Sequence, residues 1–280
     1  MLTKINIFSP IFLSLFFFIA SAQETYTPKK AGKDQIIIDG LMNPEEWSNA
    51  TPIEIDIEVK PGNNLEAGIK TIGYITYTDT HLFLAFHAFD DPKNIRASIR
   101  SRDDFGIISD DFVTLRLDTY ADGRNNYLLL SNAFGSQLDA RAINALTDED
   151  RYDSSFNIDY QSVGSIVNDG YQVEFKIPFS SIPFPNGKDQ LWHFNLFRKY
   201  YRNGNEIEVR SQSFDRDNPC EVCQTTDRLI LNDIVFKSVS YIVSLGFFCS
   251  SKLIKINGSG FILENAFSAL KPLSVLFGNF

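Results

Sequence analysis

The sequence predicts an all-β protein, a β-sandwich or jelly roll of antiparallel strands with short helical turns. Apolar and charged or polar side chains alternate over residues 53–59 and again over residues 171–177, which is the period of a strand with one solvated face. Turn sequences such as Asp122-Gly123 separate the apolar runs. Only residues 44–49 and 92–100 suit a helix, and both segments are short. Short strands joined by turns are typical of a sandwich.

The clearest element in chain order is a hairpin within residues 158–177, where Asn168-Asp169-Gly170 supplies the tight turn because Gly takes positive φ at little cost. Residues 82–89 are apolar on nearly both faces, so we expect a central strand covered on each side. The strands that we expect besides the hairpin are residues 53–59, 69–77, 82–89, 112–118, 127–132, 137–143, 192–198 and 207–212.

The composition indicates a globular, acidic protein. The chain has 280 residues, 44% of them hydrophobic, with a net charge of -9, so it is long enough to bury a core. Because this charge repels phosphate backbones, nucleic acid is not an expected partner. The first 22 residues hold one Lys, and residues 236–280 hold four Lys and one Glu, which leaves a net charge of -13 on residues 23–235. The acidity therefore belongs to the middle of the chain.

The two ends differ from the middle. Residues 1–22 have the pattern of a secretory signal peptide, in which Lys4 precedes an apolar run and Ala20-Ser21-Ala22 resembles a cleavage site. We expect the mature chain to begin at Gln23 and to be exported to the periplasm, outer membrane or cell surface, the alternative being an uncleaved membrane anchor. A single domain is expected over residues 23–235, followed by a tail of uncertain structure over residues 236–280.

Six segments follow one another over about residues 34–235. They are Ile38-Asp39-Gly40 followed by Trp47, Tyr77-Thr78-Asp79 with residues 82–86, Asp110-Asp111-Phe112 running to Leu117-Asp118, Asn132-Ala133-Phe134-Gly135, Tyr171 to Glu174 leading into Ile177-Pro178-Phe179, and residues 192–198. In their order and spacing, these segments together resemble the family 9 carbohydrate-binding module, a secreted β-sandwich. The resemblance implies a non-catalytic module that attaches polysaccharide-degrading enzymes to glycan.

Similar modules precede a large outer-membrane β-barrel of uncharacterised function in exported proteins of Bacteroidetes-type bacteria. The 45 residues from 236 to 280 are too few for a barrel of eight strands of about ten residues each. We expect either a truncated relative or a remnant of the start of the barrel. An outer-membrane barrel is accordingly the second expected partner, beside a polysaccharide or oligosaccharide.

Aromatic side chains that stack on sugar rings are the central feature of the binding site that the resemblance implies. Two Trp hold the sugar in the type module, and this chain has only Trp47 and Trp192. We expect both to be core residues, since Trp47 lies inside the opening motif and Trp192 alternates with other apolar residues along a strand. Tyr200 is a further candidate for the stacking ring. The residues that we expect to bind carbohydrate combine aromatic rings with charged groups for the hydroxyls; they are Asp104, Phe105, Asp139, Arg141, Tyr152 and Arg198.

The loop carboxylates allow two other interpretations. A glycosidase needs two carboxylates at a defined separation, and candidate pairs occur at Asp103-Asp104, at Asp110-Asp111 and in the 148–153 segment. With 35 acidic residues in the chain, such pairs arise by chance, so we expect no catalytic residue. Structural calcium is a second interpretation, implied mainly by the family, with the turn at Asp118 and Asp122 as the candidate site. We expect no other cofactor and no transition-metal site.

Cysteine spacing points to a short disulfide. Cys220 and Cys223 form a Cys-x-x-Cys pair, and neither the βαβ context of a redox motif nor the second ligand pair of a zinc site accompanies it. In an oxidising compartment we expect a disulfide between them, with Cys249 unpaired in the tail.

Three functions follow in order of preference. The first is a carbohydrate-binding module of a polysaccharide-utilisation system. The second is a structural or gating cap on an outer-membrane barrel without sugar binding, which the shortage of Trp favours. The third and weakest is hydrolysis of glycosidic bonds.

Overall fold

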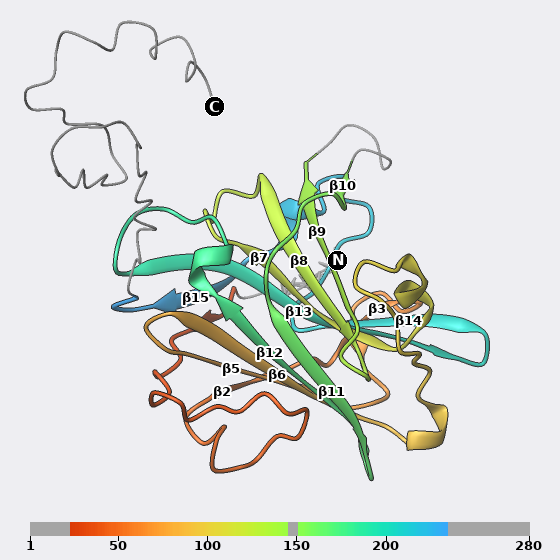
Figure 1. Cartoon of the computed structure of the whole chain (residues 1–280). Helices are drawn as coiled ribbons and strands as arrows, with labels where there is room; N and C mark the ends of the chain where they lie inside the picture. Colours follow the sequence, from red (N-terminus) through yellow and green to blue (C-terminus); the bar gives the residue numbers. More distant parts are fainter. Residues whose placement is uncertain (1–22, 145–150, 235–280) are drawn as a thin grey trace, which may run out of the picture.

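The computed structural model describes residues 23–144 and 151–234, which form two antiparallel sheets packed face to face (Figure 1). The predicted all-β sandwich is confirmed. The strands are β1 (Thr25–Tyr26), β2 (Thr51–Glu54), β3 (Ile57–Lys60), β4 (Leu65–Glu66), β5 (Thr71–Tyr77), β6 (His81–Phe89), β7 (Phe112–Asp118), β8 (Asn125–Asn132), β9 (Gln137–Ile143), β10 (Tyr152–Asp153), β11 (Gln161–Val167), β12 (Gly170–Pro178), β13 (Gln190–Arg202), β14 (Asn205–Arg210) and β15 (Asp227–Leu231).

The strand order sets the two layers. The ten-stranded sheet runs β10-β9-β8-β7-β13-β14-β3-β4, with β15 paired to β13 and β1 paired in parallel to β15. The five-stranded sheet runs β11-β12-β6-β5-β2. Figure 1 shows β6 between β12 and β5, so the predicted central strand and the predicted hairpin β11–β12 are both confirmed.

The main core lies between the sheets. Leu84 and Phe86 of β6 face Leu115 of β7 and Trp192 of β13 within one buried cluster, and all four side chains are fully buried. Each fully buried side chain of this size stabilises the fold by about 1.5–3 kcal/mol. Trp192 is therefore a core residue, as the alternation along its strand predicted.

A second apolar cluster covers the outer face of the five-stranded sheet. There the segment before β2 packs Trp47 against Phe83 and Ala85 of β6. The Trp47 indole donates to Oε1 of Glu174 at 2.8 Å, and the backbone N–H of Gly40 donates to Oε2 of the same carboxylate at 2.8 Å. The Asp-Gly to Trp motif thus anchors the N-terminal segment, and Trp47 is a core residue as predicted.

Residues 53–59 form two strands rather than the one strand predicted. Strand β2 pairs with β5 of the five-stranded sheet, and β3 pairs with β14 of the ten-stranded sheet. Ile55, fully buried, lies at the crossing between the layers. Alternation continues through the crossing because alternate residues of both strands face the same core. The pattern therefore does not reveal that the pairing partner changes from one sheet to the other.

The two segments that were predicted to be helical do not form α-helices. Residues 44–49 form consecutive turns, and residues 92–100 contain only the short 3₁₀ segment η1 (Pro92–Asn94). The other 3₁₀ segments are η2 (Phe105–Ser109), η3 (Phe179–Ser181) and η4 (Val222–Gln224). Strands β1, β4, β10 and β15 were not predicted, since each has two to five residues and no long alternation. Within 23–144 and 151–234, the helices are all too short to cross a bilayer.

Candidate functional site

The candidate site lies on the face of the ten-stranded sheet that is turned away from the five-stranded sheet, here called the outer surface. Apolar side chains form its floor, among them Leu128, Leu130, Leu138 and Phe197, which keep 5–7% of their surface exposed. Ile107 of η2 packs onto one part of this floor, and Val222 of η4 packs onto another. Residues 211–226, which connect β14 to β15, therefore lie over the outer surface.

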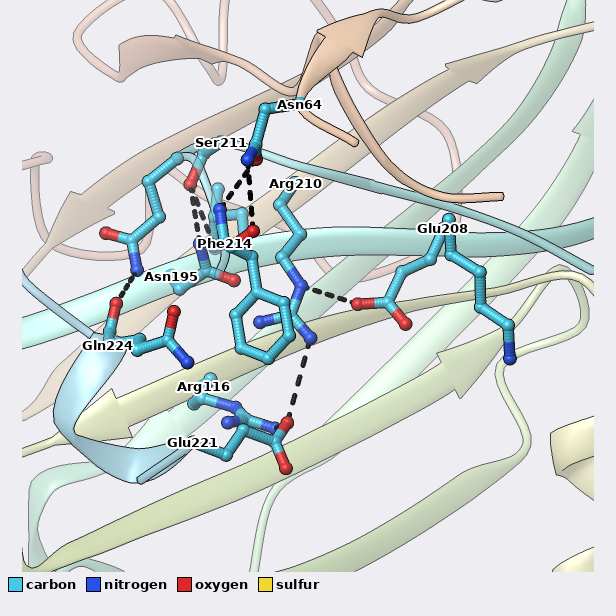
Figure 2. Close-up of polar contacts among 12 residues, drawn as sticks. Asn64, Arg116, Asn195, Glu208, Arg210, Ser211, Phe214, Glu221 and Gln224 are labelled. Carbon is cyan, nitrogen blue, oxygen red and sulfur yellow. Dashed lines mark hydrogen bonds and ion pairs between the residues drawn. The ribbon is translucent and has the colours of Figure 1, made fainter. Parts of the chain in front are cut away.

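Glu221 is the centre of the polar contacts on this surface. Its Oε1 lies 2.6 Å from Nη2 of Arg116 and 3.7 Å from Nη2 of Arg210. Its Oε2 accepts from the Tyr152 hydroxyl at 2.6 Å and lies 3.4 Å from Nη1 of Arg151. Figure 2 shows Arg116 and Arg210 converging on this carboxylate. One carboxylate thus joins side chains from β7, β10, β14 and the 211–226 connection.

The strand register explains why these charges meet. Arg116 is directly opposite Asn195 of β13, and Thr114 is directly opposite Phe197, which in turn is opposite Arg210. Directly opposite residues of antiparallel strands point to the same face. Strand β7 therefore sends apolar side chains to the core and Thr114 and Arg116 to the outer surface.

The arginines hold Glu221 in its ionised form. Burial works against the charge, but the nearby Arg116 guanidinium, the Tyr152 hydroxyl and Arg210 lower the pKa of Glu221 to about 2. Arg116 is only 2% exposed, so removing Glu221 would leave a buried cation without its counter-ion. Such a change is costly in proteins.

Aromatic rings lie on both sides of this charged centre. The guanidinium carbon of Arg210 lies 3.8 Å from the centre of the Phe214 ring, a stacked arrangement that also orients the Arg donors. The Phe214 backbone is held by Asn64, whose side chain accepts from the Phe214 N–H at 2.8 Å and donates to its C=O at 3.1 Å. On the other side, the Tyr152 side chain is 43% exposed.

The disulfide fixes the segment that carries Glu221. Cys220 and Cys223 are joined in the structure, with their Cα atoms 5.4 Å apart. Cys220 packs against the floor of the outer surface, and Cys223 lies beside Gly123 of the β7–β8 turn, where an added Cβ would come within 3.5 Å of the Cys223 Cα. Glu221 therefore sits inside a small closed loop with both ends packed.

Several buried polar atoms beneath the 211–226 connection have no hydrogen-bond partner within the described ranges. They are Oγ1 of Thr114, Nε and Nη1 of Arg116, Nδ2 of Asn126 and Oδ1 of Asn195. All four residues lie on the outer face of the sheet, in adjacent positions of β7, β8 and β13. Unsatisfied buried groups of this kind are costly, so they favour buried water at this place.

Of the six residues predicted to bind carbohydrate, the structure places three on the side of the outer surface. Tyr152 contacts Glu221 as described. Asp104 caps η2 by accepting from the Gly106 N–H at 2.8 Å, and Phe105 follows it with 57% of its surface exposed. Because Ile107 of η2 packs on the floor of the outer surface, Phe105 and Tyr152 flank one face of the sheet.

The other three predicted residues point elsewhere. Arg198 is fully buried between the sheets, where its Nη2 lies 2.7 Å from Asp90 Oδ2. Asp139 is buried and accepts from Arg102 at 2.6 Å, and Arg141 pairs with Asp153 at 2.9 Å. Each of these side chains is paired with an opposite charge, Arg198 and Asp139 inside the fold and Arg141 in a partly exposed pair, and none of them joins the outer surface.

Tyr200 is likewise no surface platform, because its side chain is only 2% exposed. Position near a strand end did not distinguish core from surface here. For Tyr200 and Arg198 the two-residue alternation along β13 would have done so, since both share the parity of Trp192, which faces the core.

The carboxylate pairs considered for catalysis are also engaged in the fold. Asp110 accepts from Arg100 at 2.8 and 3.0 Å and from Asn132 at 2.9 Å. Asp111 is buried and lies 3.4 Å from Arg202, and burial raises its pKa although Arg202 and Arg198 oppose that effect. Residues 148–150 and Cys249 lie outside the described residues.

The candidate calcium turn is satisfied by its own backbone. Asp118 accepts from Gly123 N–H at 2.8 Å and from Tyr120 N–H at 3.1 Å. Across the described ranges, no three side chains of His, Cys, Asp or Glu gather as a metal site. The turn geometry therefore accounts for Asp118 without an ion.

Four residues of this site were not predicted from the sequence: Arg116, Arg210, Phe214 and Glu221. Arg116 was detectable, because a charged residue inside the otherwise apolar 112–117 run must either face a partner or line a site. Phe214 and Glu221 lie in an irregular connection whose place over the sheet depends on the fold of residues 211–226. No local pattern marks them.

Comparison with known proteins supports the fold assignment. No family model and no curated protein sequence matches the chain. Among solved structures, a proposed carbohydrate-binding protein from Bacteroides uniformis ATCC 8492 superposes with a TM-score of 0.58 at 11% identity, covering 75% of this chain and 99% of that one.

A family 9 carbohydrate-binding module from Caldicellulosiruptor kristjanssonii, in complex with cellotriose, gives a TM-score of 0.53 at 14% identity and covers 78% of this chain and 99% of that one. Its complex with glucose gives 0.50 at 12% identity, covering 77% and 99%. At these identities the similarity concerns the fold. The chain thus has a β-sandwich of the kind found in carbohydrate-binding modules.

Proposed function

We propose that this protein is a carbohydrate-binding module that holds a saccharide on its outer surface. The observation that carries the proposal is the arrangement around Glu221, with Tyr152 and Phe214 on either side of three arginines. A pyranose has an apolar face that aromatic rings can cover, and its hydroxyls need both donors and acceptors. Tyr152, which is 43% exposed, supplies area, and Glu221 and Arg151, whose side chains are 13% and 23% exposed, supply acceptors and donors.

The buried unpartnered atoms support the same function. Waters beneath the 211–226 connection would satisfy the free donors of Arg116 and the free acceptor of Asn195 and would bridge them to sugar hydroxyls above. The fold is shared with modules solved in complex with cellotriose and with glucose, which supports a saccharide as the class of ligand.

The proposal extends to the cellular role. The signal-peptide pattern predicted for residues 1–22 and the disulfide at Cys220–Cys223 fit an exported protein in an oxidising compartment. We place it in polysaccharide catabolism in the periplasm, at the outer membrane or at the cell surface, where it attaches degrading enzymes to glycan. A barrel partner at the outer membrane belongs to the same proposal.

Calorimetric titration with xylo-, cello- and manno-oligosaccharides tests the binding function. We expect saturable heat with one sugar class. Tyr152→Ala and Phe214→Ala should each bind that sugar at least tenfold more weakly, since each removes an aromatic ring that packs against the apolar face of the sugar. Tyr152→Phe keeps the ring and should bind more tightly than Tyr152→Ala. Leu41→Ala is the control, because Leu41 is 53% exposed on the segment that covers the other sheet.

Two results would contradict the proposal. If folded protein gives no heat with any of the three sugar classes, the cap function without sugar binding becomes the better account. If Phe105→Ala abolishes binding while Tyr152→Ala and Phe214→Ala leave it unchanged, the saccharide binds beside η2 and not around Glu221.

A further inference from the structure

A pocket lies at the other layer of the sandwich, at one end of the five-stranded sheet. It has a volume of about 460 Å³, within the range of about 300–1,000 Å³ typical of small-ligand sites. Its walls come from residues 30–36, from the β5–β6 turn and from Lys176 of β12. The N-terminal segment is fixed there by a bond from the Ala31 N–H to the Tyr77 C=O at 2.8 Å.

Three lysines line this pocket. Lys30 is neutralised by Asp79 at 2.7 Å and also donates to the Asp233 C=O at 2.7 Å. The ammonium groups of Lys33 and Lys176 have no hydrogen-bond or ion-pair partner among residues 23–144 and 151–234. Lys176 is half-buried and lies directly opposite Phe83 of the neighbouring strand β6. A partly desolvated cation without a counter-ion favours an anion beside it.

This arrangement contrasts with the rest of the protein. Residues 23–235 carry a net charge of -13, yet three lysines and only two acids, Asp34 and Asp79, line the pocket. The pocket is therefore a local excess of positive charge on an acidic protein. Such a contrast selects against long polyanions, which the whole molecule repels, and favours a small ligand with a few negative groups.

The remaining walls fit a sugar ring. The Thr78 hydroxyl, which accepts from the His81 N–H at 3.3 Å, keeps its own proton to donate. Asp34 can accept from hydroxyls, and Ile36 and Phe83 supply apolar area. An inorganic oxyanion would fill only a small part of 460 Å³. We propose that this pocket binds an acidic sugar unit, with its carboxylate held by Lys33 and Lys176.

The inference does not depend on the outer surface, and the test separates the two sites. The full chain is titrated with trigalacturonic acid and with the neutral analogue galactotriose. We expect trigalacturonic acid to bind, galactotriose to bind at least tenfold more weakly, and added salt to weaken the binding of the acid. Lys176→Gln and Lys33→Gln should each reduce the affinity about tenfold.

Lys93→Gln is the matched control, because it removes one positive charge at η1, which follows the far end of β6. Tyr152→Ala reports on the outer surface and should leave binding of the acid unchanged. The proposal is overturned if Lys176→Gln and Lys33→Gln bind trigalacturonic acid as the parent protein does, or if folded protein does not bind it. It is also overturned if inorganic sulfate binds as tightly as the sugar, since the pocket would then recognise charge alone.

Discussion

Replacing Glu221 by Gln should change how the stability of the protein depends on pH. The pKa of Glu221 is lowered from 4.5 to about 2 in the folded protein, and its side chain is only 13% exposed. At 1.36 kcal/mol per unit, this shift corresponds to about 3 kcal/mol of stability. Because the folded pKa is the lower one, the contribution is present above pH 4.5 and is lost as the pH falls toward 2.

Linkage gives the size of the effect at an accessible pH. Between pH 7 and pH 3, the parent protein should lose about 2 kcal/mol of unfolding free energy from Glu221 alone. Glu221→Gln should be less stable than the parent at pH 7 and should lack this part of the pH dependence. Urea unfolding followed by Trp fluorescence at several pH values measures both quantities.

Glu45→Gln serves as the control, since Glu45 is exposed on the segment that covers the other sheet. It should reproduce the parent curve. If Glu221→Gln and the parent lose the same unfolding free energy between pH 7 and pH 3, Glu221 is not held ionised by the arginines, and the reasoning about the outer surface is wrong.

Three other predictions concern the fold. Trp47→Phe removes the donor to Glu174, so it should lower the unfolding free energy by about 1–3 kcal/mol in urea unfolding without changing sugar affinity. Burial raises the pKa of Asp227 to about 6, although the hydrogen bond from the Glu24 N–H opposes that effect. Asp227→Asn should therefore stabilise the protein at pH 7 by up to about 3 kcal/mol. In the same assay, this gain in unfolding free energy should disappear below pH 4. Gly170→Ala should lower the thermal midpoint, because φ there is +149° and an added Cβ would lie 2.1 Å from the Ala88 C=O, and an unchanged midpoint would contradict this.

The sequence was sufficient for most of the fold because alternation and turn chemistry act locally. The β11–β12 hairpin and the central position of β6 followed from apolar periodicity and one turn. The crossing at Ile55 did not, since the same residues are buried whichever sheet pairs with them. Strand β15 was missed because five residues between irregular segments give too short a pattern.

The site was less predictable for a physical reason. Tyr152 and Phe105 were identified as aromatic residues in polar loops, and exposure of both agrees with that expectation. Arg198 looked similar in sequence, yet it is buried against Asp90 between the sheets. A buried ion pair joins residues 108 positions apart, so only the tertiary fold distinguishes it from a charged group at the surface. Glu221 and Phe214 depend on long-range contacts in the same way.

Mapping of backbone amide chemical shifts tests the central claim most directly. The isotopically labelled chain would be titrated separately with cellotriose, xylotriose and mannotriose. If a saccharide binds around Glu221, at least one of these sugars should shift the amides of Tyr152, Phe214 and Glu221 most strongly, and the amides of the five-stranded sheet should stay unchanged. Shifts confined to the five-stranded sheet, or no shifts with any of the three sugars, would contradict the account.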